Sequence, residues 1–291
     1  MQRSVAATLL GVLAVSVGAQ ERPLPDTAAF LQEVRKHLAT DDERQTGYMY
    51  LETRREQRLD ADGRPESESV KVFESYPALP GEKRWNRLIA RDGQPVPPQD
   101  LEQADRERQR HVEEYARRVA QDPAAERARR EREREREHRE RLESIDDVFR
   151  VFDVRMIGRQ LLEGHSTIVL SLTPRPDASP RTREGNIMKS FSGRVWISES
   201  DYELVKLDVV AIDTASIGLG LLARIHKGTR ASFERRKVNG EAWLPAVTSY
   251  SASARVGLIK VLRRSGTSEF SGYKKFNVDT FTLYDRKPEK P

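Results

Sequence analysis

Apolar and polar residues alternate along most of this chain, in two blocks that run from Gly47 to Arg91 and from Val148 to Tyr284. In the first block, Met49, Leu51 and Thr53 alternate with charged residues. A period of two gives each strand one face for a core and one face for water. The pattern predicts antiparallel strands joined by short turns, and it excludes alternating βαβ units with a parallel sheet.

Turn signals divide the second block into hairpins. Asn239-Gly240 separates residues 227–238 from residues 241–253, and Asn-Gly is a strong hairpin signal because both residues tolerate positive φ. Ser200-Asp201 separates residues 193–199 from residues 203–213 in the same way. Between these hairpins and the start of the block, prolines at 174, 176 and 180 predict a mobile loop that runs to about Ser190.

A helix is expected before the first block. Residues Thr27 to Ala39 place Phe30, Leu31, Val34 and Leu38 along one helical stripe, and Asp26 is available as the N-cap.

The segment between the two blocks, Leu101 to Leu142, is rich in Glu, Arg, Gln and Ala, which favour helix. Asp122-Pro123 predicts a break that divides it into two helices. Residues 126–143 hold eight Arg and seven Glu, a net charge of +1, which weighs against a nucleic-acid partner. We interpret residues 98–145 as a charged helical insertion whose surface is solvated, with a protein partner as the other interpretation.

Residues 1–19 have the features of a secretory signal peptide. Arg3 precedes the apolar residues 5–17, and Val17-Gly18-Ala19 is a small-residue cleavage site. We therefore expect a periplasmic protein whose single domain covers residues 20–291. No cysteine follows the apolar run, so we expect no lipid anchor.

The composition and motifs exclude several classes of protein and of catalytic or metal site. The 291 residues have a mean hydropathy of −0.71 and include no cysteine, which excludes a multi-spanning membrane protein, a thiol nucleophile and Cys-ligated metals. The sequence contains neither HExxH nor GxSxG. We expect no catalytic residue, no cofactor and no metal site.

Two groups of residues are candidates for ligand contact. An apolar segment followed by basic residues is typical of a loop that touches a membrane or lines a cavity, although a short helix that caps the core would look the same. Thr248 to Ala254 places small side chains on one strand face, which leaves room for a packed helix or for an acyl chain. The candidates for the cavity or membrane contact are Ile217, Leu219, Leu221, Leu222, Ile225, Tyr250 and Ala252.

Residues 222–264 carry the surplus positive charge of the chain, with ten basic residues against two acids, a balance of +8. An acidic lipid surface suits such a segment, and an ordinary solvated strand face is the other interpretation. The candidates for this basic surface are Arg224, Lys227, Arg230, Lys260, Arg263 and Arg264.

Three segments give the chain a family resemblance: the strand Gly193 to Ile197, the strand Leu204 to Leu207, and the hairpin Val238 to Pro245. Together with the N-terminal helix and the meander, they resemble the LolA/LolB-like superfamily of outer-membrane lipoprotein-sorting proteins. The resemblance implies an open half-barrel, a single curved antiparallel sheet of the α+β class with helices on its concave side. It also implies that this concave, apolar face binds acyl chains and that the protein is not an enzyme.

The sequence thus supports three hypotheses for function. The first is a periplasmic protein that binds lipid or lipoprotein acyl chains for sorting or transport. The second is an envelope protein-interaction or stress-sensing module of the same fold, which uses the charged helix. The third is a secreted hydrolase, which would need convergent His, Ser or carboxylate side chains in a cleft.

Overall fold

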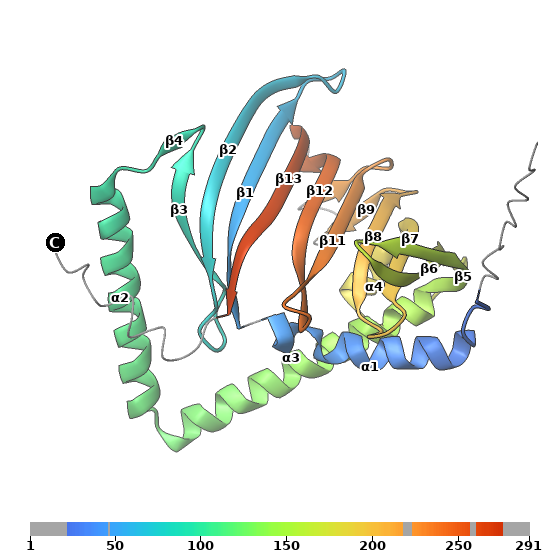
Figure 1. Cartoon of the computed structure of the whole chain (residues 1–291), viewed down its shortest axis with the longest axis horizontal. Helices are drawn as coiled ribbons and strands as arrows, with labels where there is room; N and C mark the ends of the chain where they lie inside the picture. Colours follow the sequence, from blue (N-terminus) through green and yellow to red (C-terminus); the bar gives the residue numbers. More distant parts are fainter. Residues whose placement is uncertain (1–21, 46, 218–222, 257–259, 276–291) are drawn as a thin grey trace, which may run out of the picture.

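A computed structural model describes residues 22–45, 47–217, 223–256 and 260–275 of the chain. In these residues thirteen strands form one open antiparallel sheet, with the main order β4-β3-β2-β1-β13-β12-β11-β8-β7-β6-β5 (Figure 1). The sheet confirms the predicted α+β half-barrel class. The strands are β1 (Tyr48–Leu59), β2 (Pro65–Tyr76), β3 (Trp85–Arg91), β4 (Gln94–Pro95), β5 (Phe152–Leu162), β6 (His165–Pro174), β7 (Phe191–Ser198), β8 (Leu204–Ala211), β9 (Ala215–Ile217), β10 (Ala223–Ile225), β11 (Arg230–Val238), β12 (Ala242–Val256) and β13 (Lys260–Lys275).

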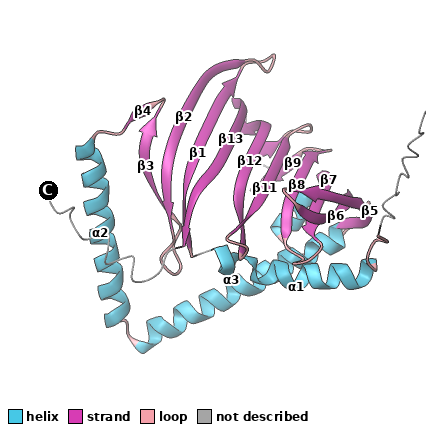
Figure 2. Cartoon of the chain, in the orientation of Figure 1, coloured by secondary structure: helices cyan, strands magenta, loops and turns pink. Residues whose placement is uncertain are grey.

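The described segments also contain four helices (Figure 2), and none of them has the length and apolar character needed to cross a bilayer. They are α1 (Thr27–Gln45), α2 (Pro98–Gln121), α3 (Ala124–Val151) and α4 (Arg183–Met188). The predicted cap of α1 is confirmed, because the backbone N–H of Ala29 donates to the carboxylate of Asp26 at 2.9 Å. The predicted break between two charged helices is confirmed as well, since α2 ends just before Asp122-Pro123 and α3 begins just after it.

The hairpins expected in the second block are present. β11 and β12 flank Asn239-Gly240, whose φ values of 53° and 70° are both in the left-handed region. β7 and β8 flank the turn that contains Ser200-Asp201. The apolar segment after β8 was expected to be a loop between two strands. Its ends instead form a short extra pair, in which Ala223 of β10 faces Ile217 of β9.

Helices α2 and α3 connect the two opposite edges of the sheet. β4 lies at one edge and β5 at the other, yet they are consecutive strands in the chain. Eleven strands in the main order correspond to about 48 Å at the usual strand spacing, and the 28 residues of α3 extend about 42 Å. The charged helical insertion expected over residues 98–145 therefore has a role in the sheet topology. Its helices form the crossover that allows both edges to belong to one sheet.

The two crossover helices contact the sheet differently. α2 docks on the β3 edge mainly through polar groups: Arg87 donates two hydrogen bonds of 2.7 Å to Asp105, and His111 lies 2.9 Å from Glu82. Residues 131–141 of α3 are all exposed, so this part of the crossover stands clear of the sheet (Figure 1). Only the C-terminal turns of α3 enter the core, where Val151 is fully buried.

The apolar core occupies one end of the sheet. Phe30 and Val34 of α1 pack with Val151 of α3 against Ile168 and Leu170 of β6. We call the face of the sheet that carries Ile168 and Leu170 the inner face and the opposite face the outer face. The main core cluster includes no residue of β1, β2, β12 or β13. The helices therefore cover the inner face mainly over β5 to β8, and α1 also reaches β12.

Asp147 of α3 fixes the segment that follows β6. Its buried carboxylate accepts hydrogen bonds from the backbone N–H groups of Arg181 and Thr182, from the hydroxyl of Thr182 and from Arg150, at 2.7 to 3.0 Å. Gly185 leaves room for it, since a Cβ there would lie 2.3 Å from the carboxylate. The segment predicted as a mobile loop is thus pinned to the core and contains α4.

Burial alone would raise the pKa of Asp147, but these hydrogen bonds lower it to about 2. A lowered pKa stabilises the fold at every pH above about 4, and this contribution is lost as the pH falls through about 2.

We expect Asp147→Asn to lower the free energy of unfolding by about 2 to 4 kcal/mol at neutral pH, because an amide cannot accept all four hydrogen bonds. The wild-type advantage should shrink between pH 4 and pH 2, as measured by urea unfolding at each pH. Asp146→Asn is the matched control, since Asp146 forms a more exposed ion pair with Arg35 and should cost at most about 1 kcal/mol. Equal losses in both variants would contradict the role of Asp147.

Shortening the crossover should break the sheet. Deletion of residues 126–143 removes about 27 Å of helix. The seven residues then left between Gln121 and the buried Asp147 extend about 25 Å at most, which is shorter than the intact helical path of about 37 Å. We expect the variant to lose the docking of α2 and to melt several degrees lower. A control that replaces the same residues with an Ala, Glu and Lys helix of equal length should melt like the wild type. A deletion variant that melts at the wild-type temperature would rule out a structural role for the crossover.

Candidate functional site

One row of side chains on the inner face runs across the neighbouring strands from β6 to β1, and its residues change from apolar to charged along that path. Each residue of the row is the register partner of the next one on the neighbouring strand. In order from the core outward they are Leu172, Gly193, Val209, Ala231, Tyr250, Gly266 and Glu56. Residues that face each other on adjacent strands point to the same side of a sheet. The inner face therefore runs from a closed core, across small apolar residues, to a charged end.

The middle of this face is the candidate site. Its apolar residues are half-buried, so they remain accessible where α1 and α3 no longer cover the sheet. Ala252 faces Arg264, and Ala254 faces both Ile225 and Leu262. We call this set of residues the apolar floor: Val209, Ile225, Ala231, Ala252, Ala254 and Leu262.

The candidate residues from the apolar segment are only partly placed. Ile225 and Ala252 belong to the apolar floor, and Tyr250 lies beside it with 38% of its surface exposed. Leu219, Leu221 and Leu222 lie outside the described residues, as does the side chain of Ile217. Of residues 248–254, Thr248, Tyr250, Ala252 and Ala254 are on the inner face, and the three serines are on the outer face.

Beyond Tyr250 the inner face becomes a polar hollow of about 170 Å³. Glu52 is only 6% exposed there, and it accepts hydrogen bonds from Arg54 at 2.9 and 3.0 Å and from Ser268 at 2.7 Å. The inner face is therefore polar beyond Tyr250. The hollow is lined by Glu52, Arg54, Arg55, Glu56, Tyr250, Gly266, Thr267 and Ser268.

Tyr250 lies flat on the backbone of β13 at the border between the apolar floor and the hollow. A Cβ at Gly266 would stand 2.5 Å from the ring, so only glycine permits this contact. Burial raises the pKa of Tyr250, and Glu56 raises it further, while Arg264 and Arg54 oppose the change.

We expect Gly266→Ala to displace the Tyr250 ring and to lower the pKa of Tyr250 back toward 10, because the ring becomes more hydrated. Ultraviolet titration of the phenol measures this change, with Tyr250→Phe to assign the signal. Gly47→Ala is the control, since nothing lies within 4 Å of a Cβ at Gly47. An unchanged phenol titration in Gly266→Ala would contradict the packing.

The candidate basic residues divide between the two faces. Arg264 is on the inner face opposite Ala252, whereas Arg224, Arg230 and Arg263 are on the outer face. Lys227 is exposed in the turn before β11, and the side chain of Lys260 is outside the description. Arg255 is one of the ten basic residues counted in residues 222–264, although it is not among the singled-out candidates. It also lies on the outer face, where it is the register partner of Arg224.

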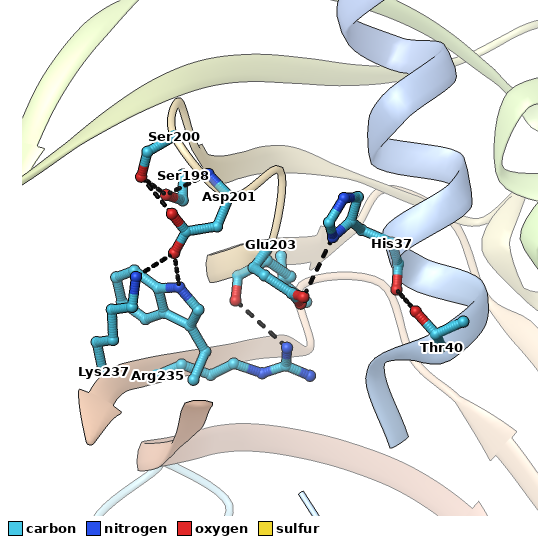
Figure 3. A network of polar contacts seen from close by, with 10 residues as sticks. His37, Thr40, Ser198, Ser200, Asp201, Glu203, Arg235 and Lys237 are labelled. Carbon is cyan, nitrogen blue, oxygen red and sulfur yellow. Dashed lines mark hydrogen bonds and ion pairs between the residues drawn. The ribbon is translucent and has the colours of Figure 1, made fainter. Parts of the chain in front are cut away.

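A second polar cluster lies under the C-terminal part of α1 (Figure 3). Asp201 accepts hydrogen bonds from Lys237 at 2.6 Å and from the indole N–H of Trp243 at 2.9 Å, and Ser200 also donates to it. Burial would raise the pKa of Asp201, but these bonds lower it to about 2. The carboxylate therefore joins the β7–β8 turn to the β11–β12 hairpin.

The same cluster bears on the hydrolase hypothesis. His37 lies 3.4 Å from the buried Glu203, whereas the hydroxyls of Ser198 and Ser200 interact with each other and with Asp201 (Figure 3). A hydrolytic triad needs a hydroxyl bonded to the histidine. His37 has no such hydroxyl in this cluster. Elsewhere the Ser253 hydroxyl lies 3.2 Å from Nδ1 of His226, and among the described residues no carboxylate contacts that imidazole. No group of three or more His, Asp or Glu in the described segments could hold a metal ion.

The chain matches no known family profile and no curated protein. Several solved structures match with low identity. A putative outer membrane lipoprotein-sorting protein domain from Vibrio parahaemolyticus is 10% identical over 88% of this chain and 96% of its own, with a TM-score of 0.32. A LolA superfamily protein from Nitrosomonas europaea is 10% identical over 86% and 96%, with a TM-score of 0.26.

The complex of MucA and MucB from Pseudomonas aeruginosa also matches, with 11% identity over 87% of this chain and 100% of the matched chain, and a TM-score of 0.25. These matches include the superfamily that the sequence resembles. TM-scores this low carry no conclusion about function, which has to come from the chain's own surfaces.

Proposed function

We propose that this chain is a non-enzymatic binding protein of the periplasm, which holds an acyl chain of a lipid or lipoprotein on the apolar floor. The observation that supports this most is that four apolar residues of the inner face are only half-buried: Ile225, Ala252, Ala254 and Leu262. Small apolar residues on an accessible sheet surface leave room for a ligand that is itself apolar.

The driving force would be the burial of methylene groups against the floor. Each fully buried methylene contributes about 0.8 kcal/mol, so half-burial of about ten of them contributes about 4 kcal/mol. From β8 to β13 the floor crosses three strand spacings, or about 14 Å. The polar hollow beyond Tyr250 offers charged groups to the polar end of such a ligand.

The place of action follows from residues 1–19, which lie outside the described residues. We propose that they direct export and are removed after Ala19. Fractionation of the native host followed by N-terminal sequencing would test this, with a chain that begins at Gln20 in the periplasmic fraction as the expected result. A cytoplasmic chain that retains Met1 would contradict it.

Ala252→Asp should remove the bound lipid. A carboxylate on the apolar floor loses hydration when an acyl chain covers it, which is unfavourable without a partner. Ser271→Asp is the matched control, because it adds the same charge at an exposed position of β13 outside the apolar floor and away from the basic residues near Ala252. Native mass spectrometry of protein purified from its own envelope, with lipid extraction, should show at least ~10-fold less lipid in Ala252→Asp only.

The proposal would be contradicted if the wild type carried no lipid, or if both variants lost lipid to the same extent. The melting temperature of each variant separates loss of lipid from loss of fold.

The exposed part of α3 favours a second candidate function, an envelope interaction module. Residues 131–141 are all exposed, and residues 131–137 alternate Glu and Arg. Exchanging Glu for Arg and Arg for Glu over residues 131–137 keeps the length that the crossover needs. Loss of a partner from affinity capture with unchanged lipid content would support this candidate over the first, whereas unchanged capture would contradict it.

A further inference from the structure

The hairpin end of β12 and β13, together with β10, carries four arginines on the outer face. Arg224 of β10 is the direct register partner of Arg255 of β12. Arg263 of β13 faces Ser253, and Arg230 of β11 faces Ser251, which places both on the same face as Arg255. We call Arg224, Arg230, Arg255 and Arg263 the basic patch.

The basic patch is not neutralised within the described part of the chain. No described carboxylate lies within ion-pair distance of any of its four guanidinium groups, whereas outer-face Lys206 contacts both Asp208 and Glu234. Like charges directly opposite each other on neighbouring strands are destabilising. The pairing of Arg224 with Arg255 therefore costs stability in the free protein, and an external anion would relieve that cost.

The residues around the basic patch favour a bilayer surface over other polyanions. Val261 faces Arg255 and is 42% exposed, so the patch includes an apolar side chain. On the inner face of the same strand ends lie Ile225, Ala254 and Leu262 of the apolar floor. Basic groups on one face can contact lipid headgroups, while apolar groups on the other face can contact acyl chains. This end of the sheet therefore suits the boundary between the headgroup and acyl-chain layers of a bilayer.

We propose that the basic patch docks this end of the sheet on an anionic bilayer through lipid phosphate groups. Arginine suits this role because its planar guanidinium donates paired hydrogen bonds to phosphate oxygens. The proposal goes beyond acyl-chain binding, since it concerns the opposite face and a different ligand group. Docking would place the apolar floor beside the membrane from which an acyl chain could come.

The test is flotation of the purified protein with vesicles of phosphatidylethanolamine and phosphatidylglycerol, compared with neutral phosphatidylcholine vesicles. We expect binding to the anionic vesicles only. Binding should weaken strongly when the salt rises from about 0.1 M to about 1 M, because the screening length falls from about 10 Å to about 3 Å.

A combined variant replaces all four arginines of the basic patch with Gln: Arg224→Gln, Arg230→Gln, Arg255→Gln and Arg263→Gln. We expect its affinity for anionic vesicles to fall at least ~100-fold, because each arginine contributes about five-fold. The matched control replaces Arg127, Arg132, Arg134 and Arg139 with Gln, which removes the same charge from exposed positions of α3. The control should bind like the wild type. The patch variant should melt at or above the wild-type temperature, since it loses the repulsion between Arg224 and Arg255.

Three results would overturn the proposal: no binding of the wild type to anionic vesicles, equal binding to neutral vesicles, or equal losses in the two four-residue variants. Native mass spectrometry keeps this test separate from acyl-chain binding. A patch variant that still retains its lipid shows that any failure to dock concerns the outer face alone.

Discussion

The connection between β4 and β5 is the constraint on which this architecture depends. These consecutive strands lie at opposite edges of the sheet, so the chain has to travel its full width between them. A rigid path of α2 and α3 meets that requirement, because helices fix distance in a way that a flexible loop does not. The same path brings Asp147 and Val151 to the β5 end, where they complete the core and hold the segment that contains α4.

This connection also explains why the sheet has two different halves. α1 and the end of α3 close the core on the inner face over β5 to β8, and beyond it only α1 reaches β12. Farther along, the inner face changes from Ala231 to Tyr250 and then to Glu56. The apolar floor lies between the closed core and the charged end, which is where a sheet can bury a ligand without unpacking its own core.

Much of the fold was predictable from local patterns. The period-two alternation, the Asn239-Gly240 turn, the Asp26 cap and the break at Asp122-Pro123 all depend on neighbours in the sequence, so the chain's order reveals them. The segment after β6 was not predictable as ordered, because its anchor, Asp147, lies more than thirty residues earlier than its partners. The sequence places Arg255 in the basic segment but cannot pair it with Arg224, because that pairing joins two different strands.

The sequence by itself determined the antiparallel class, the turns, the helical character of the charged segment and the composition of each strand face. Each of these follows from backbone sterics and side-chain period within a few residues. Only the tertiary structure decided the strand order, the role of the charged helices as a crossover, and the separation of the basic patch from the apolar floor. Those depend on which strands pair across long separations, and pairing is set by the packing of the whole sheet.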